Sequence, residues 1–185
     1  MEKDRIILGI DPGTNVMGYG IIRCKGKNLN VVCLGSVTFS KKDSHILKLS
    51  NIFKTTLDLI DGHLPDEMAI EAPFYGKNIQ SMLKLGRAQG VAMAAALYRK
   101  VEVFEYSPRR IKQAITGNGN ASKEQVAAML ENLLSVVIVD NLDASDGLAA
   151  AVCHSFQKSV GSEAAKSHNS WKSFIQENPG RIALK

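Results

Sequence analysis

Four acidic residues stand where a carboxylate could take part in chemistry. Asp11 follows an apolar run and precedes a Pro-Gly pair, so its side chain is expected at the edge of a sheet. Glu71 lies among apolar neighbours in AIEAP, inside a predicted buried strand. Asp143 and Asp146 are three residues apart at the start of an apolar helix and therefore share one face. An unpaired carboxylate is costly to bury, so acids in such places need a partner.

Taken singly, three of these acids have ordinary structural explanations. Asp143 or Asp146 would favour a helix N-terminus through the helix dipole, and Asp11 would favour a turn. Glu71 is harder to explain without a function, because glutamate is rarely buried in a strand. Together, these hard oxygen donors suit Mg²⁺ or Mn²⁺. Carboxylates converging at a sheet edge could hold two ions about 3.5–4 Å apart, which activate water and stabilise a leaving oxygen in phosphodiester cleavage.

Hydrophobic patterns predict the elements that must position these acids. Strands are expected at 5–11, 19–23, 30–39, 68–72 and 101–106, and helices at 43–62, 78–100, 108–116, 122–134 and 142–158. Gly62 is the expected stop signal of the first helix, and Ser122 with Gln125 forms a capping-box pattern. Short connections make the first three strands an antiparallel meander, and the alternation that follows implies an α/β fold with a mixed sheet.

Composition limits the class of protein. A chain of 185 residues, 45% of them hydrophobic, fits one domain with a real core. We expect that domain at 1–157, followed by a polar, loosely ordered tail at 158–185. The net charge of +5 permits a polyanionic partner without identifying one. Three cysteines without CxxC spacing argue against a disulfide framework or a zinc site and favour a reducing cytoplasm.

Nothing in the sequence indicates export or a membrane span. The N-terminal apolar run is short and ends at an aspartate, unlike a signal peptide. The longest apolar stretches fall well below the ~20 residues that a membrane helix needs. We therefore expect a soluble cytoplasmic protein.

Five motifs carry a resemblance to a known family. In chain order they are GIDPGTNVMGYGII, AIEAPFYGKN, LKLGRAQGV, FEYSPRRIKQAITGNGNASKEQV and DASDGLAAAVCH. Their order and spacing over about residues 5–157 resemble the RuvC family of Holliday junction resolvases. Ser145 and Gly147 stand where alanine is more usual in the last motif.

The resemblance implies a ribonuclease H-like fold, with a mixed five-stranded sheet and helices on both faces. It implies a homodimeric, structure-specific endodeoxyribonuclease that resolves Holliday junctions by paired symmetric nicks in DNA recombination and repair. The cofactor would be Mg²⁺, two ions per active site, with Mn²⁺ able to substitute. The catalytic metal ligands would be Asp11, Glu71, Asp143 and Asp146. By the same resemblance, the partners would be four-way junction DNA and the RuvA-RuvB branch-migration complex.

Basic residues predict where DNA would bind. Lys112 and Lys123 flank a Gly/Asn-rich loop that would let ammonium and backbone groups approach phosphates, and the resemblance assigns them DNA contacts. Further candidates are Lys77, Arg109 and Arg110. Other lysines and arginines on helices are more simply explained as solvated surface.

An aromatic residue and a long helix complete the expected DNA-binding machinery. Phe74 is either a core aromatic at a strand end or, as the resemblance implies, a ring that stacks on an unpaired junction base. The small residues of helix 78–100 favour close packing on the sheet, and the resemblance places a dimer interface there. Two-fold symmetry would suit a junction with two equivalent strands to cut.

Two other functions compete. IDPGT also resembles the phosphate loop of actin-like ATPases and sugar kinases, but those enzymes need two such domains, and this chain is long enough for one. A non-catalytic DNA-binding module would use the acids only for caps and ion pairs, and would leave Glu71 unexplained. A metal requirement separates that module from a nuclease.

Overall fold

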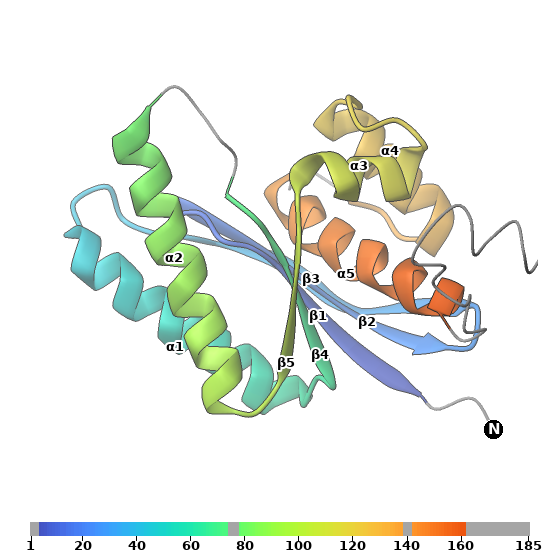
Figure 1. The fold of residues 1–185 in the computed structure, drawn as a ribbon, viewed down its shortest axis with the longest axis horizontal. Coiled ribbons are helices and arrows are strands. Elements are labelled where there is room, and N and C mark those ends of the chain that lie inside the picture. Colours follow the sequence, from blue (N-terminus) through green and yellow to red (C-terminus); the bar gives the residue numbers. More distant parts are fainter. Residues whose placement is uncertain (1–3, 74–77, 139–141, 162–185) are drawn as a thin grey trace, which may run out of the picture.

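A five-stranded mixed sheet forms the centre of the molecule, with helices on both faces (Figure 1). The computed structural model describes residues 4–73, 78–138 and 142–161. The elements are β1 Arg5–Asp11, β2 Val16–Lys25, β3 Asn28–Thr38, α1 His45–His63, β4 Glu67–Glu71, α2 Ile79–Tyr98, β5 Glu102–Tyr106, α3 Pro108–Thr116, α4 Lys123–Leu134 and α5 Leu142–Gly161. The strand order is β3-β2-β1-β4-β5. The predicted α/β fold class is confirmed.

The direction of the strands brings two acids to one edge of the sheet. β1, β2 and β3 form the expected antiparallel meander, whereas β1, β4 and β5 run parallel. Because the carboxyl ends of parallel strands meet at the same edge, the last residues of β1 and β4, Asp11 and Glu71, lie together there. Ser107, which follows β5, lies at the same edge.

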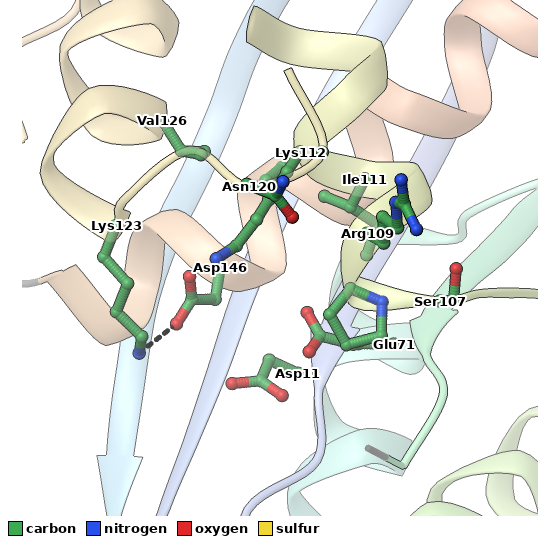
Figure 2. Close-up of a pocket in the computed structure, with 13 residues that line it drawn as sticks. Asp11, Glu71, Ser107, Arg109, Ile111, Lys112, Asn120, Lys123, Val126 and Asp146 are labelled. Atoms are coloured by element: carbon green, nitrogen blue, oxygen red, sulfur yellow. Dashed lines mark hydrogen bonds and ion pairs between the residues drawn. The ribbon is translucent and has the colours of Figure 1, made fainter. Parts of the chain in front are cut away.

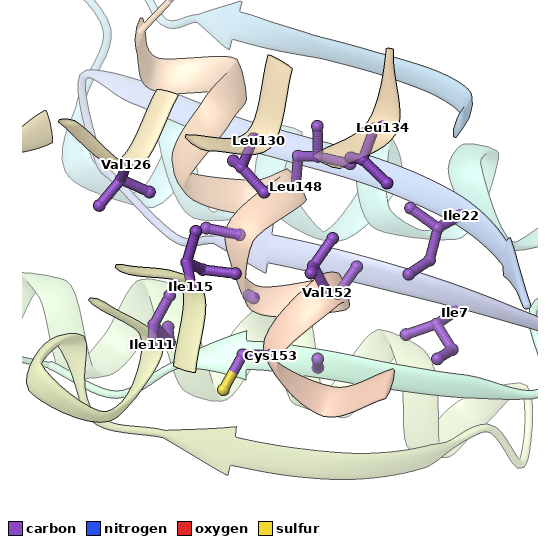
Figure 3. Close-up of a cluster of buried hydrophobic side chains, with 14 of the residues drawn as sticks. Ile7, Ile22, Ile111, Ile115, Val126, Leu130, Leu134, Leu148, Val152 and Cys153 are labelled. Carbon is purple, nitrogen blue, oxygen red and sulfur yellow. The ribbon is translucent and has the colours of Figure 1, made fainter. Parts of the chain in front are cut away.

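Alternating side chains of the sheet build two hydrophobic cores. On one face, Leu8 and Ile10 of β1 pack against α1 and α2. On the other face, Ile7 packs with residues of α3, α4 and α5, among them Ile111 and Val152 (Figure 3). This alternation fixes the register of β1, because a shift by one residue would exchange its two apolar faces.

Helix α5 lies directly on the sheet because glycine leaves room for it. A Cβ atom on Gly18 of β2 would stand 1.9 Å from the carbonyl oxygen of Asp143, and one on Gly147 would stand 2.5 Å from Cα of Tyr19. Farther along α5, His154 hydrogen-bonds through Nε2 to Oε2 of Glu67 at 2.8 Å. These contacts fix the helix that carries two of the four acids.

The structure corrects some element boundaries. Helix α1 does not stop at Gly62. Its last residue is His63, and it is capped by Leu64, whose backbone is left-handed with a φ of 48°. Strands β2 and β3 are longer than expected because only Gly26 and Lys27 separate them, with Gly26 at a φ of 60°. The capping box of Ser122 and Gln125 is present.

At its C-terminal end the chain is helical for longer than expected. Helix α5 runs to Gly161, three residues beyond the predicted end. The rest of the predicted tail, 162–185, lies outside the described residues, as do Phe74 and Lys77. No helix among the described residues is long and apolar enough to span a membrane.

Candidate active site

A cavity of about 680 Å³ opens at the edge of the sheet where the parallel strands end (Figure 2). Asp11, Glu71 and Asp146 line it, together with Lys112 and Lys123. The other lining residues are Ser107, Pro108, Arg109, Ile111, Gly119, Asn120, Val126 and Ala149. The fold therefore brings three of the four predicted acids together from β1, β4 and α5, which are far apart in the sequence.

Burial and crowding raise the pKa values of the acids. Burial, followed by the charges of Asp146 and Asp143, raises the pKa of Asp11 to about 6. Burial, followed by the charges of Asp11 and Asp146, raises the pKa of Glu71 to about 8. The pKa of Asp146 is also raised, chiefly by burial and against the opposing effect of Lys123. In a poorly solvated cavity, each negative charge favours the protonated form of the neighbouring carboxyl group. A bound cation would favour the ionised forms instead.

Lys123 supplies positive charge among the acids. Its Nζ donates to Oδ2 of Asp146, and lies 3.4 Å from Oδ1 of Asp143. Asp143 is not a lining residue of the cavity, so this shared ammonium is its link to the site. Burial lowers the pKa of Lys123, but the hydrogen bond to Asp146 and the charges of the acids outweigh it, so the pKa is raised overall.

The carboxylate oxygens suit a hard divalent cation, although the carboxylates do not lie close enough together for three of them to share one. Asp11, Glu71, Asp143 and Asp146 offer carboxylate oxygens, the donors that Mg²⁺ and Mn²⁺ prefer. Among the described residues, no three His, Cys, Asp or Glu side chains are grouped closely enough to hold a metal ion as they stand. Because Lys123 bonds to Oδ2 of Asp146, its ammonium would compete with a cation for this carboxylate.

The predicted DNA-binding residues fall into three groups. Lys112, Lys123 and Arg109 line the cavity. Arg110 is turned to another partner, since its Nη2 donates to Oε1 of Gln157. Phe74 and the neighbouring Lys77 lie outside the described residues.

Two polar side chains that line the cavity were not predicted as site residues. Ser107 follows the third parallel strand, and its Oγ accepts a hydrogen bond from the backbone of Arg110 at the start of α3. The rule that ligands bind at the carboxyl ends of parallel strands would have indicated it. Asn120 belongs to the Gly/Asn-rich loop that the sequence had already singled out, and only the fold shows that this loop lines the same cavity as the acids.

Comparisons with known proteins show the family to which this chain belongs. The family model "Crossover junction endodeoxyribonuclease RuvC" matches residues 7–154. The RuvC protein of Christiangramia forsetii is 56% identical over 183 residues, 98% of this chain and 95% of the relative. That of Cytophaga hutchinsonii is 57% identical over 180 residues, 97% of this chain and 88% of the relative.

Solved structures show the same fold. Thermus thermophilus RuvC, solved in complex with a Holliday junction substrate, has a TM-score of 0.78 and 29% identity over 85% of this chain and 96% of that chain. The yeast mitochondrial Holliday junction resolvase Ydc2 has a TM-score of 0.57 at 12% identity, covering 80% of this chain and 77% of that chain, a likeness of fold alone. The predicted ribonuclease H-like architecture and the resemblance are therefore confirmed: the chain belongs to the RuvC family of crossover junction endodeoxyribonucleases.

Proposed function

We propose that this protein is a structure-specific endodeoxyribonuclease that resolves Holliday junctions by paired, symmetric nicks in DNA recombination and repair. The observation that carries the proposal is the cavity in which Asp11, Glu71 and Asp146 meet Lys112 and Lys123 at one sheet edge. Membership of the RuvC family supports it, as does the likeness to a relative solved with a Holliday junction. Such a cavity suits phosphodiester cleavage, in which negative charge grows on the attacking and leaving oxygens.

The proposed cofactor is Mg²⁺, two ions in each active site, with Mn²⁺ able to substitute. The ions would be held by Asp11, Glu71, Asp143 and Asp146. The raised pKa values of Asp11 and Glu71 support this, because they show that these carboxylates lack enough positive charge beside them. When bound, these ions would supply an activated water and stabilise the leaving oxygen. The protein's own part is to orient the carboxylates, and the charge of the bound ions would favour their deprotonated forms.

We propose that basic side chains at the cavity bind the DNA backbone. Lys112, Lys123 and Arg109 line the cavity and would face phosphates close to the bond that is cut. Lys77 and Arg110 are proposed as further DNA contacts. Phe74 is proposed to stack on a base at the opened centre of the junction.

A homodimer is part of the proposal because a junction presents two equivalent strands. Apolar side chains on α2 support this role: Ile79, Leu83 and Leu97 are exposed in the single chain. A two-fold interface along this helix would present two active sites to one junction. We also propose cooperation with the RuvA-RuvB branch-migration complex and a cytoplasmic location, for which the three free thiols are suited.

Cleavage of a synthetic four-way junction tests the proposed function. The protein is incubated with the junction or with a linear duplex of the same sequence, each with Mg²⁺ or with EDTA. We expect paired nicks in the junction alone, only with Mg²⁺, and products that a ligase reseals. Cleavage that is equal in EDTA, or equal for the linear duplex, would contradict the proposal.

A further inference from the structure

A second cavity, of about 460 Å³, lies between the β1–β2 connection and the first turns of α1 and α2. These two helices cover the face of the sheet opposite α3, α4 and α5, and in Figure 1 both begin on the left of the view. The cavity is lined by Thr14 and Asn15 of the connection, and by Lys41, Lys48 and Lys84. None of these residues lines the candidate active site.

Lys48 is buried without a countercharge. Its relative exposure is 9%, and its Nζ donates to Oδ1 of Asn15 at 3.2 Å. No carboxylate in the described part of the chain pairs with it, although Asp43 also lines the cavity. A buried ammonium is costly unless an anion compensates its charge. A cavity that gathers Lys48 with Lys41 and Lys84 therefore has the charge of an anion site.

His45 adds an independent indication. It is the first residue of α1 and lines the same cavity. Its Nε2 is buried and has no hydrogen-bond partner within the described residues. A buried polar atom without a partner costs free energy that a ligand oxygen would recover.

Both helix N-termini at the cavity favour an anion. Helix α1 begins after Ser44 and helix α2 after Asn78, and neither has an acidic residue in its first turn. Among the residues that line the cavity, Asp43 alone carries a carboxylate, so the partial positive charges of the two helix N-termini favour a phosphate there.

We propose that this cavity binds a backbone phosphate of junction DNA and thus anchors the substrate on the sheet face opposite α3–α5. Thr14 follows Asp11 by three residues, a separation of at most ~11 Å along the chain. A DNA molecule bound at the acids at the end of β1 would therefore have this second cavity within reach. The inference rests on the proposed function, since it takes the anion from the same DNA.

Charge substitutions test this phosphate site through binding of a four-way junction in EDTA. Lys48→Met keeps the length of the side chain, and Lys84→Ala removes an exposed charge whose loss should not affect folding. Each should weaken binding and lower the slope of log K against log salt by about 0.9. Asp43→Asn should act in the opposite direction and tighten binding, a gain that a merely structural role would not produce.

Lys25→Ala is the matched control, because this exposed lysine lies at the opposite end of β2. The inference would be overturned if Lys48→Met and Lys84→Ala both changed the slope of log K against log salt by the same amount as Lys25→Ala. A second result would also overturn it. If inorganic phosphate alone stabilised the parent, and Lys48→Met abolished that stabilisation without changing junction binding, the cavity would be a site for the free ion and not for DNA. Failure of the parent to bind the junction would instead contradict the proposed function.

Discussion

At the scale of single residues, the candidate active site concentrates negative charge that the chain only partly balances. Burial and neighbouring carboxylates raise the pKa of Asp11 to about 6 and that of Glu71 to about 8. Both values lie above those of an unfolded chain, so the folded protein binds these protons more tightly. Its stability must then fall as the pH rises through each folded-state pKa.

Between pH 6 and 8, this loss should come mainly from Glu71. In metal-free protein, the free energy of unfolding should fall by at most about 1.4 kcal/mol per pH unit on its account. Glu71→Gln should flatten the dependence over this range, whereas Glu102→Gln, at an exposed glutamate of β5, should not. Urea unfolding in EDTA at a series of pH values measures the effect. Parallel curves for the parent and Glu71→Gln would contradict the raised pKa.

Lys123 competes with a metal ion for the same carboxylates, because its ammonium bonds to Asp146 and lies close to Asp143. Lys123→Met should therefore strengthen Mg²⁺ binding in the absence of DNA, as followed by titration calorimetry. The same change should weaken junction binding and lower its salt slope by about 0.9. Lys54→Met, an exposed lysine on α1, serves as the control and should leave both quantities unchanged. Weaker Mg²⁺ binding in Lys123→Met would show that the lysine supports the metal site rather than competing for it.

At the scale of elements, the close contact between α5 and β2 positions Asp143 and Asp146. Gly18→Ala would place a Cβ atom 1.9 Å from the carbonyl oxygen of Asp143, so the start of α5 must shift. We expect a loss of about 1–3 kcal/mol in stability from overpacking, with slower junction cleavage. Urea unfolding and a nicking assay measure the two effects.

Gly62→Ala provides a matched control with the opposite sign. A Cβ atom on Gly62, inside α1, meets no other atom within 4 Å. Alanine is the better helix former, so this change should stabilise the protein by about 0.4–1 kcal/mol and leave cleavage unchanged. If Gly18→Ala matched Gly62→Ala in stability and activity, the contact with β2 would not position the acids.

The sequence predicts the helices and strands better than it predicts the contacts between them. The bounds of β1 and α3 are as expected, because an apolar run before a Pro-Gly pair and a Ser-Pro start are strong local signals. The end of α1 was missed because Gly62 does not take the left-handed backbone that ends a helix, which Leu64 adopts instead. The burial of Lys48 was also missed: it depends on Asn15, a contact between distant parts of the chain that no local pattern records.

At the scale of the whole molecule, the sheet separates two cavities that both lie near the end of β1. One contains the acids and lies toward α3, α4 and α5, and the other lies at the starts of α1 and α2. A four-way junction is large enough to contact both, so binding and cleavage draw partly on different residues. The four acids were predicted from their types and positions, whereas the meeting of Asp11 and Glu71 at one edge depends on the parallel pairing of β1 and β4.

Glu71→Gln separates binding from chemistry most directly, because the amide keeps the shape of the side chain and removes its charge. The cleavage rate of a saturated four-way junction is measured with Mg²⁺, and the affinity for the same junction is measured in EDTA. We predict a fall in rate of at least about 1000-fold, or ~4 kcal/mol, with affinity unchanged or tighter. A rate within about tenfold of the parent, or ~1.4 kcal/mol, would show that Glu71 is not part of the catalytic site.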